Sequence, residues 1–172
     1  QAAPTFSEDE IRLIVETARS SGRAVAAHAS TPEGMRRAAA GGVETIEHGN
    51  NGTAKVFKLM KEKNVAWIPT LSVGNNARKK DVFKMAVAAG VTIGSGSDVG
   101  VFTHGEEARE IELLGEYGMT PADAIKAATS VNAKILHMED RIGRVKAGLL
   151  ADLIAVEGNP LQDLSVLHKV KF

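Results

Sequence analysis

Three side chains that can bind a divalent metal ion lie at the ends of separate apolar runs in this 172-residue sequence. His28 lies near the end of AVAAHAS, His48 near the end of VETIEHGN, and Asp98 at the end of VTIGSGSD. Two imidazoles and a carboxylate suit Zn²⁺ or a similar ion, which can lower the pKa of a bound water to roughly 7. Taken singly, such a histidine can be structural and such an aspartate can form a turn. The prediction of a metal site therefore depends on their joint placement.

Alternating strands and helices would position these residues. Helical periodicity and capping signals such as Ser7 with Glu10 separate apolar runs that predict four buried strands, at residues 24–30, 43–50, 64–73 and 91–98. Four strand–helix units in a row imply parallel strands with right-handed crossovers. The carboxyl ends of parallel strands meet on one face, so the three side chains can converge there. This pattern fits either a doubly wound sheet or part of a (β/α)8 barrel.

The last part of the chain has a different pattern. After helices predicted near residues 106–117, from 120 onward and from a cap at Ser130 to about residue 136, the sequence turns to β-type alternation with Gly and Pro turns. We therefore predict two domains, an α/β domain at residues 1–142 and part of a small β domain at residues 143–172.

Composition excludes several classes of function. Twenty-one basic and 21 acidic residues balance, so charge favours neither nucleic acid nor a membrane as partner. The absence of cysteine excludes disulfides and thiolate metal sites but leaves the compartment undecided, with the cytoplasm favoured. The glycines at 94, 96 and 100 are one residue too widely spaced for a dinucleotide-binding fingerprint, and no apolar run reaches membrane-spanning length.

Several motifs agree in order with those of a known family. The segments HAS, IEHGN, IPTLSV, GSDVG, FTHGEEARE and GRVKAGLLADLIAVEGNPLQDLSVL resemble the carboxyl-terminal half of the metal-dependent amidohydrolase superfamily. Within it, the chain is most similar to the imidazolonepropionase-like and Xaa-Pro dipeptidase (prolidase)-like branch. The resemblance implies half of a (β/α)8 TIM-type barrel with strands of a small β-sandwich.

The resemblance also implies roles for the candidate residues. His28 matches the metal ligand after strand 5, His48 the ligand after strand 6, and Asp98 the ligand after strand 8. Asp98 would also take a proton from the metal-bound water and pass it to the leaving nitrogen. His104, six residues after Asp98, would contact the substrate, although an exposed loop histidine is an equal alternative. The implied cofactor is Zn²⁺, as one or two divalent ions.

The chain departs from the family pattern in its missing first half. It has no HxH pair and no candidate for the carboxylated lysine that often follows strand 4. We therefore expect these residues alone to be inactive and to need an amino-terminal half or a second copy of the chain.

The implied reaction is hydrolysis of an amide or peptide C–N bond in a dipeptide, an N-acyl amino acid or a cyclic amide. Many deaminases of the superfamily carry a Glu three residues after the strand-5 histidine, but Thr31 stands there, with Glu33 two residues further on. Deamination remains an alternative, as does a non-catalytic fragment that packs against a partner.

Overall fold

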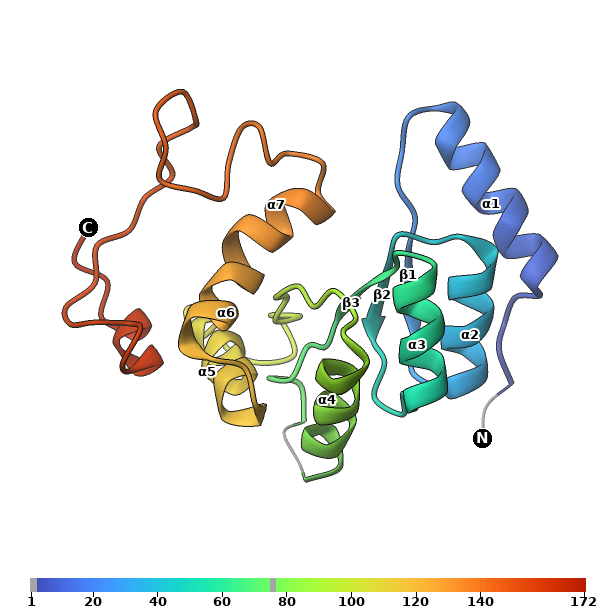
Figure 1. The fold of residues 1–172 in the computed structure, drawn as a ribbon, viewed down its shortest axis with the longest axis horizontal. Helices are drawn as coiled ribbons and strands as arrows, with labels where there is room; N and C mark the ends of the chain where they lie inside the picture. The colour runs from blue at the N-terminus through green and yellow to red at the C-terminus, as the bar shows by residue number, and fades with distance from the viewer. Residues whose placement is uncertain (1–2, 75–76) are drawn as a thin grey trace. The chain divides into compact units, whose positions relative to one another are not determined.

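A computed structural model describes residues 3–74 and 77–172, which divide into two compact units. The first unit contains residues 3–69 and 77–93, and the second contains residues 70–74 and 94–172. The first unit is coloured blue to green in Figure 1 and holds the sheet. The chain is thus a mixed α/β protein with a small parallel sheet, and the domain boundary near residue 142 stays a prediction.

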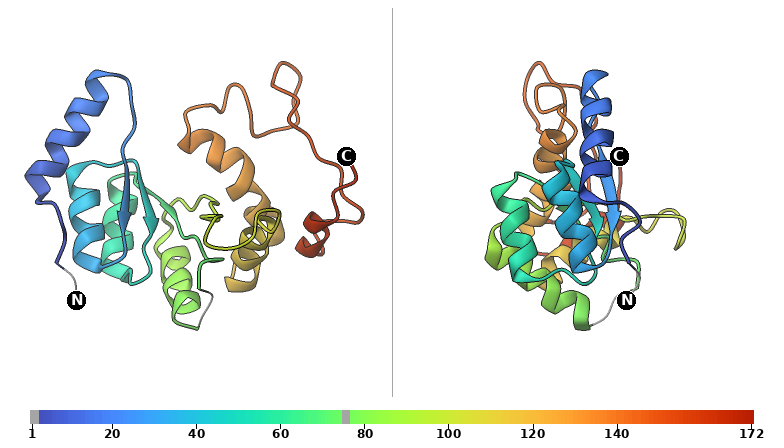
Figure 2. Two further views of the ribbon diagram at one scale, coloured as in Figure 1. Left: turned by 180° about the vertical axis from the view of Figure 1, so that it is seen from behind. Right: turned by 90° about the vertical axis from the view of Figure 1, so that its right-hand side faces the viewer.

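Three short parallel strands form the sheet of the first unit, in the order β1-β2-β3. They are β1 (Ala26–Ala29), β2 (Thr45–His48) and β3 (Ala66–Ile68). Helices α1 (Glu8–Ser20), α2 (Pro32–Gly41), α3 (Ala54–Glu62) and α4 (Ala77–Ala89) alternate with them, and each helix packs against the next. Figures 1 and 2 show α2 and α3 standing beside the strands. The first three predicted strands and the helices between them are confirmed, although each strand is shorter than predicted.

Local sequence signals explain where these helices begin. Ser7 and Glu10 form a reciprocal capping box on α1, in which the Ser7 N–H donates to the Glu10 carboxylate at 2.7 Å. Thr31 and Thr53 accept hydrogen bonds from the third backbone N–H of α2 and α3. Gly42 ends α2 with a φ of 92°, a conformation that glycine adopts without strain.

An aromatic cluster forms the core of the first unit. Trp67 of β3 lies between Phe57 of α3 and Phe83 of α4, with ring centroids 4.9 Å and 5.9 Å away. All three side chains are almost completely buried, as are Met35, Ile46 and Met60. The cluster therefore fixes both helices against β3, and burial of each aromatic ring stabilises the unit by about 2 kcal/mol or more.

The regular secondary structure of the second unit is chiefly helical, with long irregular segments between the helices. It contains α5 (Ala108–Tyr117), α6 (Pro121–Lys126), a π-helical stretch (Ala127–Val131), α7 (Asn132–Ile135) and a 3₁₀ helix (Leu164–His168). The 3₁₀ helix packs against α5, where a side chain at Gly115 would collide with Leu164. No helix in the described ranges is both long and apolar enough to cross a membrane.

Three predictions about local structure were wrong in detail. The fourth predicted strand is reduced to a single bridge between Trp67 and Ile93, because the glycine-rich sequence after Ile93 offers little to pair with. The tail has one antiparallel bridge, Val156 with Val170, where several strands were predicted. Ser130 lies inside the π-helical stretch rather than capping a new helix, because α6 continues without a break into α7.

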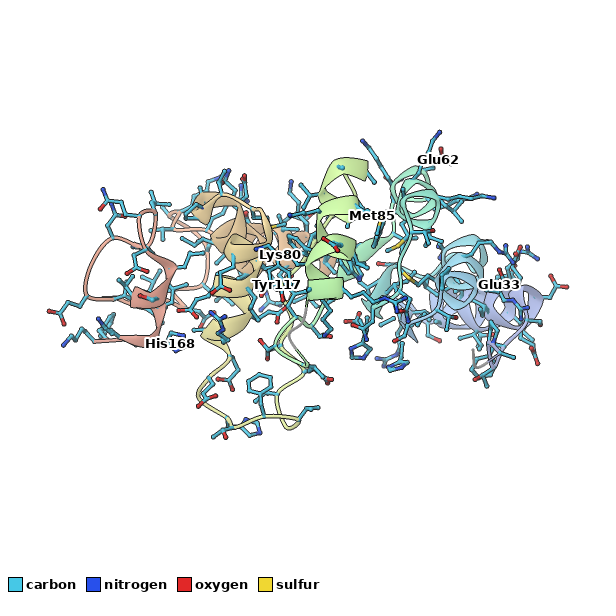
Figure 3. The ribbon with its side chains drawn as sticks, turned by 90° about the horizontal axis from the view of Figure 1, so that it is seen from below. Glu33, Glu62, Lys80, Met85, Tyr117 and His168 are labelled. Atoms are coloured by element: carbon cyan, nitrogen blue, oxygen red, sulfur yellow. The ribbon has the colours of Figure 1, made fainter. Side chains whose placement is uncertain are left out.

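A cluster of ion pairs joins α1 to α2. Glu33, labelled in Figure 3, accepts hydrogen bonds from Arg36 and Arg37, and Arg36 also reaches Glu8 of α1. The Arg36 guanidinium, followed by that of Arg37, lowers the pKa of Glu33 from 4.5 to about 2. A lowered pKa in the folded state means that this pairing stabilises the protein above pH 4.5 and is lost as the pH falls toward 2. Because Glu33 is exposed, its effect on stability is small and screened by salt.

The pKa of Glu33 can be measured directly. We expect the side-chain carboxyl carbon of Glu33 to titrate near pH 2 by NMR, and Arg36→Gln to raise this midpoint toward 4.5. Glu62, an exposed carboxylate on α3, is the reference in the same spectra. A Glu33 midpoint unmoved by Arg36→Gln would show that the guanidinium does not hold the carboxylate.

Candidate functional site

Two of the predicted metal ligands lie side by side at the carboxyl ends of adjacent strands. His28 is in β1 and His48 is the last residue of β2, where it is opposite Ala29 in the parallel register. Their imidazole rings lie edge to face, with centroids 4.4 Å apart and an angle of 63° between planes. His28 is exposed and His48 is half-buried. Two imidazoles this close, with one open to solvent, fit a pair of ligands to a divalent ion.

A sharp turn follows His48 directly. His48 and Gly49 have φ values of 70° and 58°, in the left-handed region that a residue other than glycine rarely adopts. The Gly49 N–H donates to the carbonyl of Ala29 at 3.1 Å, which ties the turn to β1. Within the described residues, the side-chain oxygen of Asn50 is buried and has no hydrogen-bond partner. A buried acceptor of this kind normally has a donor or a cation beside it, which also fits a site at this strand end.

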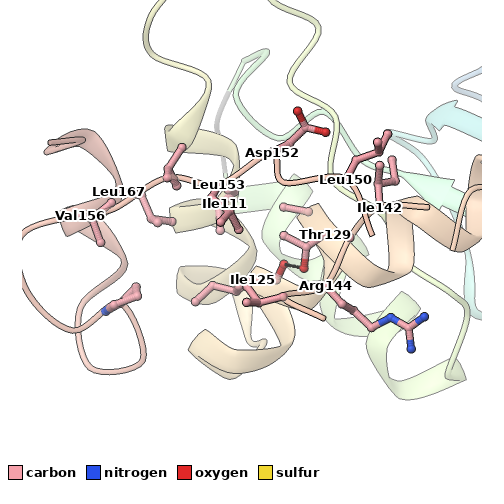
Figure 4. A pocket seen from close by; sticks show the side chains of 15 residues that line it. Ile111, Ile125, Thr129, Ile142, Arg144, Leu150, Asp152, Leu153, Val156 and Leu167 are labelled. Atoms are coloured by element: carbon pink, nitrogen blue, oxygen red, sulfur yellow. Dashed lines mark hydrogen bonds between the residues drawn. The ribbon is translucent and has the colours of Figure 1, made fainter. Parts of the chain in front are cut away.

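His28 also lines a pocket of the first unit. The pocket has a volume of about 530 Å³ and includes Ser30, Thr31 and Gly34 at the start of α2. A second pocket of about 530 Å³ lies in the second unit and is mainly apolar, lined by Ile111, Ile125, Leu150 and Leu153 among others (Figure 4). This apolar pocket contains none of the four predicted site residues, so the pocket beside His28 is the better candidate for a functional site.

Asp98 lies in the second unit, in the segment between Ile93 and α5. Its side chain is exposed and its backbone is left-handed, with a φ of 59°. The side chain of Asn132 holds this segment at Ser95, accepting from its N–H at 3.1 Å and donating to its carbonyl at 2.7 Å. Among residues 3–74 and 77–172, no three His, Asp or Glu side chains form a group that could hold a metal. The structure thus brings together His28 and His48, and the convergence of Asp98 with them stays a prediction.

His104 belongs to the same exposed segment as Asp98. Its side chain is 78% exposed, and its Nδ1 lies 3.7 Å from a carboxylate oxygen of Glu107. This contact is too long for a hydrogen bond. The predicted role of His104 in substrate binding stays a prediction.

Glu110 of α5 is a functional candidate that the sequence reasoning missed. The residue is 1% exposed, and its carboxylate accepts hydrogen bonds from the chain that follows β3. Its donors include the N–H of Leu71 at 2.8 Å, the N–H of Ser72 at 2.8 Å and the hydroxyl of Ser72 at 2.9 Å. The sequence did contain a signal, because Glu110 shares one face of α5 with the buried residues Leu113, Leu114 and Tyr117. A carboxylate on the apolar face of a helix needs buried partners.

Comparison with known proteins identifies the family. The model of the amidohydrolase family matches residues 1–171. The chain belongs to the amidohydrolase family. A relative of this family, the ochratoxinase of Aspergillus niger, is 34% identical over 190 aligned residues, which cover 96% of this chain and 39% of the relative.

Solved structures of the amidohydrolase type agree with this assignment. A Xaa-Pro dipeptidase with bound methionine in its active site matches with a TM-score of 0.93 and 37% identity, over 97% of this chain and 47% of that one. A prolidase complexed with N-methylphosphonate-L-proline matches with a TM-score of 0.86 and 32% identity, over 96% and 47%. The chain therefore spans less than half the length of each of these three relatives.

Proposed function

We propose that the intact gene product is a metal-dependent hydrolase that cleaves an amide or peptide C–N bond. The observation that carries this proposal is the pair of imidazoles at the ends of β1 and β2, in a chain of the amidohydrolase family. The similarity to a Xaa-Pro dipeptidase and a prolidase supports a dipeptide as the first substrate class to test, ahead of N-acyl amino acids and cyclic amides.

Each candidate residue has a role in this proposal. His28 and His48 would bind one or two divalent ions, with Zn²⁺ the preferred ion, and Asp98 would join them as a ligand. The bound ion would supply Lewis-acid chemistry, polarising the scissile carbonyl and lowering the pKa of water. Asp98 would accept a proton on one carboxylate oxygen and deliver it to the leaving nitrogen. His104, on an exposed segment, would contact the substrate.

The surroundings of His28 favour hydrolysis over deamination. Deaminases of the type considered above commonly carry a Glu three residues after this histidine, but the residue there, Thr31, uses its hydroxyl to cap α2 at 3.1 Å from the Gly34 nitrogen. The nearby carboxylate of Glu33 is exposed and held by two guanidinium groups, with its pKa lowered to about 2 by Arg36 and then Arg37. A carboxylate so paired is a poor proton acceptor at neutral pH.

The proposal also concerns the architecture of the intact protein. We infer that this chain supplies the carboxyl-terminal half of a (β/α)8 barrel and part of a small β-sandwich, to which the tail with its Val156–Val170 bridge would belong. Parallel strands that alternate with helices, and a match to less than half of each relative's length, support this inference. The other metal ligands and the remaining strands would then come from an amino-terminal half or from a second copy of the chain.

Metal removal tests the proposed function. We expect the purified intact gene product to hydrolyse Xaa-Pro dipeptides, to lose this activity after treatment with 1,10-phenanthroline and to regain it with added Zn²⁺. His28→Ala and His48→Ala should each lower the Zn²⁺ content measured by elemental analysis, whereas His137→Ala, at an exposed position after α7, should not. A product with neither bound divalent ion nor hydrolase activity would support the non-catalytic alternative instead.

A further inference from the structure

We propose that Trp67 is a positioning residue that holds His48 in place through the backbone of the turn that follows β2. This inference rests on the proposed function, because it gives His48 a role as a metal ligand. The indole N–H of Trp67 donates to the carbonyl oxygen of His48 at 3.1 Å. Trp67 is not one of the predicted metal ligands, so its effect on metal binding would act through His48.

The conformation of His48 needs support from its surroundings. His48 is a non-glycine residue in the left-handed region, with a φ of 70°, and such a conformation persists only where neighbouring groups hold it. The hydrogen bond from Trp67 holds the carbonyl of the peptide between His48 and Gly49, and the Gly49 N–H bond to Ala29 holds the N–H of the same peptide. Together these two bonds fix the backbone at the end of β2, and so they fix the position of the His48 Cα from which the imidazole side chain extends.

The donor itself is immobile. The Trp67 side chain is 1% exposed and packed between Phe57 and Phe83, so its N–H has one direction available. Donors of this kind, which orient a ligand without touching the metal, commonly change metal affinity when they are removed.

The shape of the turn is matched to the same aromatic cluster. A Cβ atom on Gly49 would lie 2.4 Å from the indole nitrogen of Trp67, and one on Gly52 would lie 2.4 Å from the ring of Phe57. Both glycines are buried, and the Gly52 N–H closes the turn on the carbonyl of Gly49 at 2.9 Å. Two points of the turn that carries His48 therefore rest directly on aromatic rings. The turn is therefore held by packing against both rings as well as by the hydrogen bond from Trp67.

The experiment removes the hydrogen bond with little change of shape. In the intact gene product, Trp67 is replaced by 3-benzothienylalanine, which has sulfur in place of the indole N–H, and separately by Phe. Phe83→Leu is the matched control, because it loosens packing on the same indole and leaves the hydrogen bond in place. Amide hydrogen exchange of the peptide covering residues 45–52 is measured without metal, and Zn²⁺ affinity is measured by equilibrium dialysis.

We expect both replacements of Trp67 to accelerate exchange in residues 45–52 by about tenfold relative to Phe83→Leu. They should also weaken Zn²⁺ binding by about tenfold or more, with Phe83→Leu within about twofold of wild type. Unchanged exchange in residues 45–52 would overturn the positioning role. A different result would separate the two proposals. If exchange became faster but neither His28→Ala nor His48→Ala altered the Zn²⁺ affinity, Trp67 would still position His48, and the proposed metal site would be overturned instead.

Discussion

If the intact gene product is the proposed hydrolase, replacing Asp98 by Asn should lower its kcat by about a hundredfold or more, the usual contribution of a general acid–base group. The change keeps the size of the side chain and removes the oxygen that accepts a proton. It also leaves the backbone undisturbed, because Asn tolerates a φ of 59° as well as Asp does. Steady-state kinetics with a Xaa-Pro dipeptide measure the effect, which we expect mainly in kcat because proton transfer belongs to the transition state.

Asp140→Asn is the matched control for this prediction. Asp140 is an exposed aspartate of the same unit and lines neither of the two pockets described above. The kcat of the Asp140→Asn variant should therefore stay within about twofold of wild type. The metal content of each variant separates two effects, since Asp98 is proposed both to bind metal and to move a proton. Full kcat in Asp98→Asn with normal metal content would show that the acid–base group is another residue.

The sequence correctly predicted that His28 and His48 lie near strand ends, because periodicity and strand ends are local properties, whereas their role as metal ligands stays a prediction. An apolar run that stops at a polar residue marks the end of a strand, and parallel strands place their ends together. The rule accounts for the closeness of the two rings, although not for their edge-to-face orientation. The fourth strand was predicted by the same reasoning and was wrong after Ile93, because the prediction followed the apolar run and gave too little weight to the glycines, which lower the gain from strand pairing.

Other features depended on contacts between distant parts of the chain. Asn132 holds Ser95 across 37 residues of sequence, and no spacing rule connects an asparagine inside a helix with a glycine-rich segment. The left-handed turn at His48 is similarly hidden, because its stabilising donor, Trp67, lies 19 residues away. Such long-range hydrogen bonds hold the backbone at His48 and near Asp98. The sequence could therefore predict these two candidate ligands, but it could not predict the residues that hold their backbone.

Among the residues that form long-range hydrogen bonds to the backbone, Glu110 is the one whose replacement we expect to lower the stability of the protein most. Glu110→Ala should lower the free energy of unfolding by about 3 kcal/mol, because two backbone N–H groups and one hydroxyl lose their acceptor. Leu71, which carries one of these N–H groups, is 1% exposed, so water replaces the carboxylate poorly there. Urea denaturation of the intact gene product measures the change.

Glu110→Gln separates the acceptor role from simple packing. One carboxylate oxygen accepts from the Leu71 N–H and the other from both donors of Ser72, so an amide must turn an NH₂ group toward at least one donor. We therefore expect Glu110→Gln to cost about 2 kcal/mol although its shape is nearly unchanged. Glu116→Gln, on the same helix with a side chain 49% exposed, should cost less than about 1 kcal/mol even though it breaks an ion pair with Arg109. Equal costs for Glu110→Gln and Glu116→Gln would mean that the buried carboxylate does not hold the segment after β3.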